Sequence, residues 1–190
     1  MVHEKKDTII LEIYKNSRNV FKINDVALLM NKEKDDSLCK ILNYYVKTGK
    51  LLNPRKGFYA KVGYKQEELA CLIYPPTYIS LEYVLQRAGI IFQYDSAITS
   101  VSYLNREIKI EEQTFRYRQL KGQILSNSAG IILNNNNINI ATPERAFLDM
   151  LYLNGKYYFD NLHILNKNIV RKLLPIYNMP TLVKIVKNLF

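Results

Sequence analysis

The side chains of this chain that could do chemistry at a surface are mostly basic and lie in its first third. Lys47, Lys50, Arg55 and Lys56 fall within residues 41–65, a stretch with no Asp or Glu. Unopposed Lys and Arg side chains pair with phosphates and release bound counterions. Any one of these lysines fits an ordinary solvated face, whereas the set as a whole favours contact with DNA.

Exposed Asn and Tyr side chains among such lysines can reach base edges, sugars or phosphates. The predicted DNA-contacting residues are Ser37, Lys40, Asn43, Tyr44, Lys47, Lys50, Arg55 and Lys56. The net charge of +10 agrees with a polyanionic partner, and it is unevenly distributed. Residues 1–65 carry 14 Lys/Arg against 7 Asp/Glu, residues 66–160 carry 8 against 10, and residues 161–190 carry 5 against none.

Residues for catalysis or metal binding are not arranged in any known pattern, so we expect no enzyme, no cofactor and no metal site. Glu144 and Asp149 are five residues apart, roughly 140° around a helix, so one face cannot easily present both carboxylates. Arg145 and Asp149 form an i,i+4 pair, which contributes a few tenths of a kcal/mol if it is exposed. Cys39 and Cys71 are predicted to be two buried, reduced thiols.

Arg116 and Arg118 are the best candidates in the acidic middle of the chain for binding a partner's carboxylates. They alternate with Phe115 and Tyr117, so both arginines leave the same face of a strand. A solvated polar face is the simpler interpretation of that pattern.

The elements expected to position the basic residues follow the order of a winged helix-turn-helix. They are a helix at 4–16, a strand at 20–23, a helix at 25–31 capped by Asn24, a helix at 36–48 and a hairpin at 51–60. In that arrangement the third helix enters the major groove and the hairpin, or wing, lies along the adjacent backbone.

The second half predicts a mixed α/β module with a helical C-terminus. We expect helices at 66–74 and 79–89, strands at 97–104 and 107–121, a hairpin around Asn134–Asn137, a helix opened by Thr142 and Pro143, and terminal helices broken at Pro175 and Pro180. A turn near Glu112 and Gln113 would make Ile108 and Ile110 face Phe115 and Tyr117.

The stretches "YISLEYVLQRAGII", "LLNPRKGFYA" and above all "IATPERAFLDMLYL" resemble the AbiEi family, the antitoxins of type IV toxin–antitoxin systems. The resemblance covers residues 5 to 187. It implies a DNA-binding winged helix joined to an antitoxin domain. It also implies repression of the chain's own operon at inverted repeats and counteraction of a nucleotidyltransferase toxin.

Taken together, the expected fold class is α/β (α+β). Residues 1–65 would form the winged helix-turn-helix, 66–76 a linker helix ending at Pro75-Pro76, and 77–190 the α/β antitoxin domain. No apolar run approaches the roughly 18 residues of a membrane span, so we expect a cytoplasmic protein without a membrane partner. It would bind DNA as a homodimer or as cooperative monomers. The alternatives are a winged-helix protein-interaction adaptor and a stand-alone regulator without a toxin.

Overall fold

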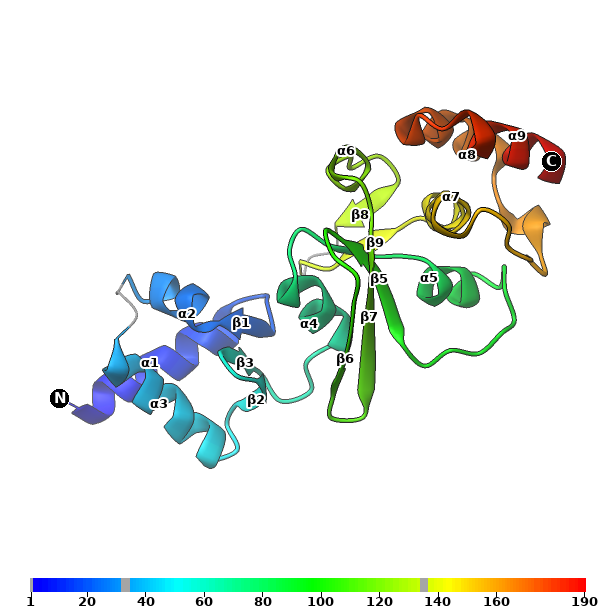
Figure 1. The fold of residues 1–190 in the computed structure, drawn as a ribbon. Coiled ribbons are helices and arrows are strands. Elements are labelled where there is room, and N and C mark those ends of the chain that lie inside the picture. Colours follow the sequence, from blue (N-terminus) through cyan, green and yellow to red (C-terminus); the bar gives the residue numbers. More distant parts are fainter. Residues whose placement is uncertain (1, 32–34, 134–136) are drawn as a thin grey trace. The chain divides into compact units, whose positions relative to one another are not determined.

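The structure is a computed structural model that describes residues 2–31, 35–133 and 137–190. It is mixed α/β, which confirms the predicted class at that level. The chain divides into two compact units, residues 1–69 and a second unit within residues 70–190 (Figure 1). Among the described residues, none of the helices is long and apolar enough to cross a membrane.

The first unit follows the order helix, strand, helix, helix, strand, strand. Its elements are α1 (Val2–Lys15), β1 (Val20–Lys22), α2 (Ile23–Leu29), α3 (Asp36–Lys47), β2 (Leu52–Arg55) and β3 (Phe58–Ala60). The strands form an antiparallel sheet in the order β1-β3-β2, with Phe21 opposite Tyr59. A single apolar core joins all three helices to the sheet and includes Ile13, Val26 and Leu42.

The second helix begins two residues earlier than the sequence predicts. α2 starts at Ile23, so Asn24 lies in its first turn and does not cap it. The carboxylate of Asp25 instead accepts a hydrogen bond of 2.8 Å from the backbone N–H of Lys22. An acidic side chain at the third helical position that accepts from the backbone N–H of the N-cap residue is one half of a capping box.

Helix α4 (Gln66–Ile73) contains the division between the two units. In the first unit, the buried carboxylate of Glu68 accepts hydrogen bonds from the backbone N–H groups of Asn19 (2.6 Å) and Val20 (3.0 Å). In the second unit, the carbonyl of Ala70 accepts a bond of 2.9 Å from the hydroxyl of Tyr117. The first turns of α4 therefore complete the first unit, and the rest belongs to the second.

The second unit is built on a mixed six-stranded sheet in the order β6-β7-β5-β4-β9-β8. Its strands are β4 (Tyr78–Ile79), β5 (Ile98–Ser102), β6 (Arg106–Ile110), β7 (Gln113–Gln119), β8 (Ile131–Leu133) and β9 (Asn139–Ala141). Its helices are α5 (Glu82–Arg87), α6 (Gly122–Leu125), α7 (Pro143–Asn154), η1 (Leu162–Ile164), α8 (Lys167–Leu173), η2 (Leu174–Tyr177) and α9 (Pro180–Leu189). Helix α7 packs between α5 and α8 (Figure 1).

One central strand differs from the sequence prediction. The predicted helix at 79–89 is shorter, because Tyr78 and Ile79 form β4 in the middle of the sheet and α5 begins only at Glu82. Ile79 pairs with Ser100 on one side and with Ile140 on the other. A short, fully buried apolar run cannot be assigned to helix or strand by periodicity alone.

The predicted hairpin at 107–121 is present, but its register differs from the prediction. A turn at Glu112 and Gln113 would place Ile110 opposite Phe115, whereas Ile108 lies opposite Phe115 and Ile110 lies opposite Gln113. The turn occupies Glu111 and Glu112, one residue earlier than predicted, and Glu111 adopts a φ of 53°. A shift of one residue in the turn changes which residues face each other along the ladder.

The hairpin of β8 and β9 is present as expected, with residues 134–136 of its predicted asparagine turn outside the described residues. The hydroxyl of Thr142 caps α7 by accepting from the N–H of Arg145 at 3.3 Å, as predicted. Pro175 lies in η2, and Pro180 begins α9 and does not break a helix. Cys71 is buried, whereas Cys39 is only half-buried, and neither of the two forms a disulfide bond.

Candidate nucleic-acid interface

Helix α3 presents one apolar and one polar face. Its first turn is capped by Asp35, whose carboxylate accepts from the N–H of Leu38 at 2.7 Å. Leu38, Leu42 and Tyr45 are buried against the core. The opposite face carries five exposed residues: Ser37, Lys40, Asn43, Tyr44 and Lys47. At 3.6 residues per turn these five span about 120° of the helix, so the structure brings together all the predicted contact residues of α3.

The β2–β3 hairpin supplies the second part of the basic surface. Gly57 closes its turn with a φ of 82°, a conformation that a glycine adopts without strain. The amide of Asn53 donates to the carbonyls of Arg55 (3.1 Å) and Phe58 (2.6 Å) across the turn. The pairing is irregular between Leu52 and Arg55. Sequence reasoning missed Asn53, although Asn followed by Pro is typical of a turn.

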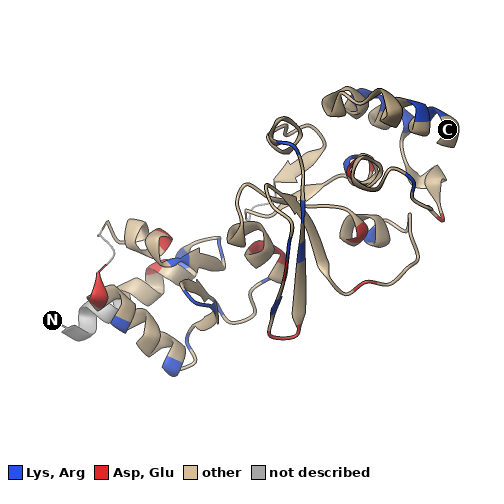
Figure 2. Cartoon of the chain, in the orientation of Figure 1, with Lys and Arg blue, Asp and Glu red and all other residues tan. Residues whose placement is uncertain are grey.

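The cations of the hairpin differ in how far they reach solvent. Lys56 at the tip is exposed, and so is Lys50 at the end of α3. Arg55 is half-buried, and its Nη1 atom is shielded from solvent. Lys61, which follows β3, is buried and donates to the carbonyl of Asn16 at 2.6 Å. Lys50 and Lys56 are therefore the two cations of this segment that are best placed for an external anion. Figure 2 shows in blue the Lys and Arg residues along α3 and the β2–β3 hairpin.

A hydrogen bond joins the polar face of α3 to the hairpin. The hydroxyl of Tyr59 on β3 donates to Oδ1 of Asn43 at 3.3 Å. Burial, followed by the influence of Cys39, raises the pKa of Tyr59 above its usual value, so the hydroxyl stays protonated as a donor. This bond uses one of the two lone pairs of Oδ1, so the amide keeps one lone pair and both N–H donors for other partners. The bond therefore sets the orientation of the predicted base-reading side chain.

Tyr44 and Lys50 are positioned by contacts at the end of α3. The ring of Tyr44 lies 5.7 Å from that of Tyr45, tilted by 60°. The carbonyl of Lys50 accepts a bond of 2.8 Å from Tyr14 of α1, and its Nζ lies 6.0 Å from the centre of the Tyr45 ring. The basic residue after the helix is thus held by both α1 and α3.

The arginines predicted to bind a partner have different surroundings in the second unit. Arg116 forms two ion pairs, Nη1 to Asp95 at 2.6 Å and Nε to Glu107 at 2.8 Å. Hydrogen bonds to Glu107 and Asp95 raise the pKa of Arg116. Arg118 makes a longer contact of 3.4 Å from Nη2 to Asn154. Arg116 therefore already satisfies its charge within the unit, and Arg118 is the better candidate of the two.

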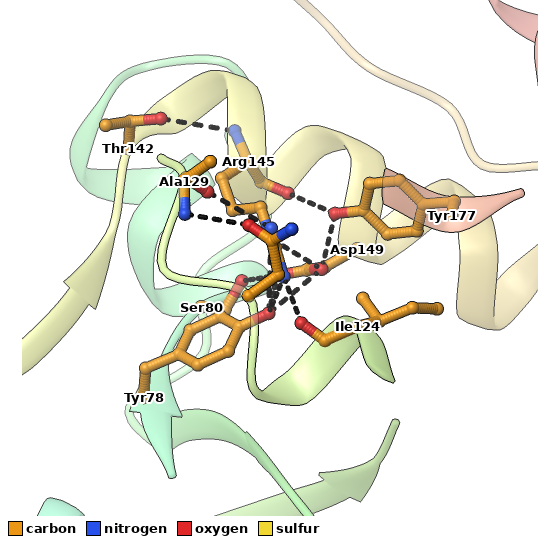
Figure 3. A network of polar contacts seen from close by, with 9 residues as sticks. Tyr78, Ser80, Ile124, Ala129, Thr142, Arg145, Asp149 and Tyr177 are labelled. Carbon is orange, nitrogen blue, oxygen red and sulfur yellow. Dashed lines mark hydrogen bonds and ion pairs between the residues drawn. The ribbon is translucent and has the colours of Figure 1, made fainter. Parts of the chain in front are cut away.

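The Arg145–Asp149 pair is buried, so the few tenths of a kcal/mol expected for an exposed i,i+4 pair do not apply to it. Neither side chain is accessible to solvent, and Nε of Arg145 lies 3.4 Å from Oδ1 of Asp149. Tyr78, Ser80 and Tyr177 donate to the carboxylate at 3.0, 2.8 and 2.6 Å (Figure 3). Arg145 also donates to the carbonyls of Ile124 (2.8 Å) and Ala129 (3.1 Å).

Burial determines the protonation behaviour of this network. It raises the pKa of Asp149, opposed by Arg145 and the three hydroxyl donors. It also raises the pKa of Tyr78 and of Tyr177 well above the usual value for a phenol. The polar groups of Arg145 and Asp149 are bonded to other groups of the protein, so the network holds α6 and the turn before β8 to α7. The arrangement is typical of a buried network that stabilises the fold.

The two acidic residues of α7 have separate partners. Oε1 of Glu144 accepts from the backbone N–H of Asn166 at 3.1 Å, whereas Asp149 belongs to the buried network. No group of three His, Cys, Asp or Glu side chains in the described part of the chain could hold a metal ion. Comparison of the chain with protein-family models finds no match, and comparison with curated proteins finds no significant one.

Proposed function

We propose that this chain is a DNA-binding transcriptional repressor of its own operon, with residues 1–69 as a winged helix-turn-helix. The observation that carries the proposal is the joint surface of α3 and the β2–β3 hairpin. Lys40, Asn43 and Lys47 are exposed on one face of α3, and Tyr59 links that face to the hairpin that bears Lys56. The element order and the β1-β3-β2 sheet are those that a winged helix requires.

The chemistry of this surface suits duplex DNA. Exposed lysines at the end of α3 and at the hairpin tip would neutralise phosphates on both sides of a groove. The amide of Asn43, in the middle of the helix face, has the donor and acceptor that read adenine in the major groove. Residues 41–65 contain no carboxylate that would repel the phosphates.

We further propose that the repressor is the antitoxin of a type IV toxin–antitoxin system and counteracts a nucleotidyltransferase toxin. This part rests on the resemblance of "IATPERAFLDMLYL" to the AbiEi family. In this chain the segment forms β9 and α7, with Arg145 and Asp149 at the centre of the second unit. The segment would therefore serve the antitoxin domain as a structural element.

A salt-titrated mobility-shift assay tests DNA binding. The probe is a duplex that carries the inverted repeats upstream of the chain's own gene, and the competitor is a random duplex of equal length. We expect binding that weakens by about 0.9 log units per log unit of salt for each phosphate contacted. Salt-insensitive binding, or none, would overturn the proposal. Co-expression with a nucleotidyltransferase reading frame from the same operon tests protection from the toxin by cell growth.

A protein-interaction adaptor is the second candidate, and one observation favours it. The first unit exposes Leu28 of α2 to 74% and Leu52 of β2 to 36%, apolar side chains that a DNA-binding module does not need. Apolar residues of this kind often contact a protein partner. The adaptor is favoured if the mobility-shift assay shows no binding while Leu28→Ser abolishes association with a partner. A regulator without a toxin is favoured if the chain binds DNA and no nucleotidyltransferase gene lies next to the chain's own gene.

A further inference from the structure

Three aromatic side chains of the second unit are unusually exposed. Tyr158 is 80% exposed, Tyr94 is 78% and Phe92 is 70%, the highest values of any aromatic residue in the described parts of the chain. Phe92 and Tyr94 lie in the connection between α5 and β5, and Tyr158 lies between α7 and η1. Exposed aromatic side chains that gather in one place mark interaction surfaces.

The two connections are hydrogen-bonded to each other, so the aromatic residues stand on a fixed support. The N–H of Phe92 donates to the carboxylate of Asp160 at 2.8 Å. The N–H groups of Asp160 and Asn161 donate to the carbonyl of Ile90 at 3.0 and 3.1 Å. Side chains held on paired segments lose less conformational entropy when a partner binds.

Two adjoining hollows lie between these connections. One has a volume of about 280 Å³ and is lined by Phe92, Tyr158 and Asp160 among others. The other has a volume of about 230 Å³ and is lined by Glu82, Tyr94 and Asp95 among others. Ile91, Gln93 and Tyr157 line both of them. We call these two hollows and their lining the acidic-aromatic surface.

Three carboxylates surround Tyr157 in this surface. Burial raises the pKa of the Tyr157 phenol, and Glu82, Asp160 and Asp95 raise it further. These carboxylates come from three separate segments of the chain, and two of them have donors already. Asp95 pairs with Arg116, and Asp160 accepts from Phe92. Oε2 of Glu82 is buried and has no hydrogen-bond donor among the described residues.

We propose that the acidic-aromatic surface binds a Lys or Arg side chain from a basic segment of a partner protein. A cation placed over aromatic faces gains energy from the ring quadrupole, and more when it is desolvated. The Glu82 carboxylate, which lines the second hollow, would accept a hydrogen bond from that cation. The carboxylates repel phosphate, which argues against nucleic acid, and no metal-binding group of side chains lies among the described residues. The inference does not depend on DNA binding.

Isothermal titration of the full chain with a capped hexa-arginine peptide tests the proposal. Hexa-citrulline, which is similar in shape and uncharged, is the matched control peptide. We expect hexa-arginine to bind at least about tenfold more tightly, since only the cation gains the ring interaction. Glu82→Gln and Tyr158→Ala should each weaken it by at least about fivefold. Tyr103→Ala, at a tyrosine 49% exposed outside this surface, and Glu111→Gln on the β6–β7 turn are control variants that should bind as the wild type does.

Tyr158→Ala removes a side chain that is almost wholly in solvent, so it keeps the test valid if Glu82→Gln fails to fold. Equal binding of both peptides would overturn the proposal, and so would wild-type affinity in the Tyr158→Ala protein. Equal weakening by the control variants would indicate a general attraction of charges and would also overturn it. Self-association that disappears in the Tyr158→Ala protein without peptide would assign the surface to a second copy of this chain in place of a partner.

Discussion

Arg145 and Asp149 lie one turn apart on α7, both inaccessible to solvent, with Nε of the arginine 3.4 Å from Oδ1 of the aspartate. An i,i+4 ion pair contributes little to stability when it is exposed. When the pair is buried, removing one partner costs much more stability. The remaining charge would be left in the protein interior without compensation. The turn before β8 also passes close to this pair, because a Cβ on Gly130 would lie 3.0 Å from the Cβ of Arg145.

We expect Asp149→Ala to destabilise the second unit by about 3–5 kcal/mol, because it leaves Arg145 buried and unpaired. Urea denaturation followed by circular dichroism measures the loss. Glu112→Ala is the matched control, since Glu112 belongs to an exposed i,i+3 pair with Lys109. That change should cost less than about 1 kcal/mol. Similar losses in the two variants would contradict a structural role for the buried pair.

The Asp95–Arg116 pair predicts a loss of stability in acid. Burial opposes ionisation of Asp95, but the N–H of Ala97 and the Arg116 guanidinium outweigh it and lower the pKa. Folding therefore favours the ionised form, and the contribution to stability is complete above the unfolded pKa of about 3.9. This contribution is lost as the pH falls through the pKa that Asp95 has in the folded protein.

The comparison of wild type with Asp95→Asn by thermal melting checks this sign. The difference in Tm should be largest near neutral pH and should shrink progressively below about pH 4, where the wild-type carboxyl takes up its proton. Glu111→Gln, at an exposed carboxylate on the β6–β7 turn, should give a small difference at every pH. A Tm difference between wild type and Asp95→Asn that grows as the pH falls would contradict a lowered pKa for Asp95.

We expect Asn43→Ala to reduce binding to the operator more than binding to random DNA, by about 1–3 kcal/mol if the amide reads a base. Tyr59→Phe should produce part of the same selective loss, because it removes the hydrogen bond that orients Asn43 and leaves the ring in place. Competition mobility shifts on the two duplexes measure both effects. Equal losses on operator and random DNA would remove Asn43 from the base-reading residues.

Lys56→Ala should weaken binding to all duplexes about equally and should reduce the salt slope by about one phosphate contact. Arg55→Ala should have a smaller effect on the slope, because Nη1 of Arg55 is shielded from solvent. Lys15→Ala is the control: Lys15 is exposed on α1, paired with Glu12, and is not among the predicted DNA-contacting residues. An equal reduction of the slope by Lys15→Ala would show that no defined surface is involved.

The bonds of Glu68 to Asn19 and Val20 predict where the first unit can be cut. A fragment of residues 1–73 should be more stable than one of residues 1–65 by at least about 2 kcal/mol, since hydrogen bonds to charged groups are strong. Glu68→Ala in the longer fragment should reproduce most of that loss. Thermal melting of the three proteins decides the matter, and equal Tm values would show that α4 is dispensable to the first unit.

Local chemistry determined much of this protein from the sequence alone. The apolar stripe of α3, the cap at Thr142 and the turn at Gly57 each depend on residues within a few positions of one another. The sequence therefore predicted α1, α3 and α7, the β2–β3 hairpin and the exposed side of α3 with its lysines. These features need no knowledge of distant segments, because hydrogen bonds within a turn and the helical period decide them.

Only the tertiary structure decided the contacts between distant segments. The strand at Tyr78 and Ile79 is paired with β5 and β9, and periodicity alone could not assign its short apolar run to helix or strand. Asp149 is buried because Tyr78, Ser80 and Tyr177 converge on it from other parts of the chain. The acidic-aromatic surface likewise requires two connections more than 60 residues apart, joined at Phe92 and Asp160. Sequence periodicity describes each segment separately, whereas burial and pairing arise only when the segments meet.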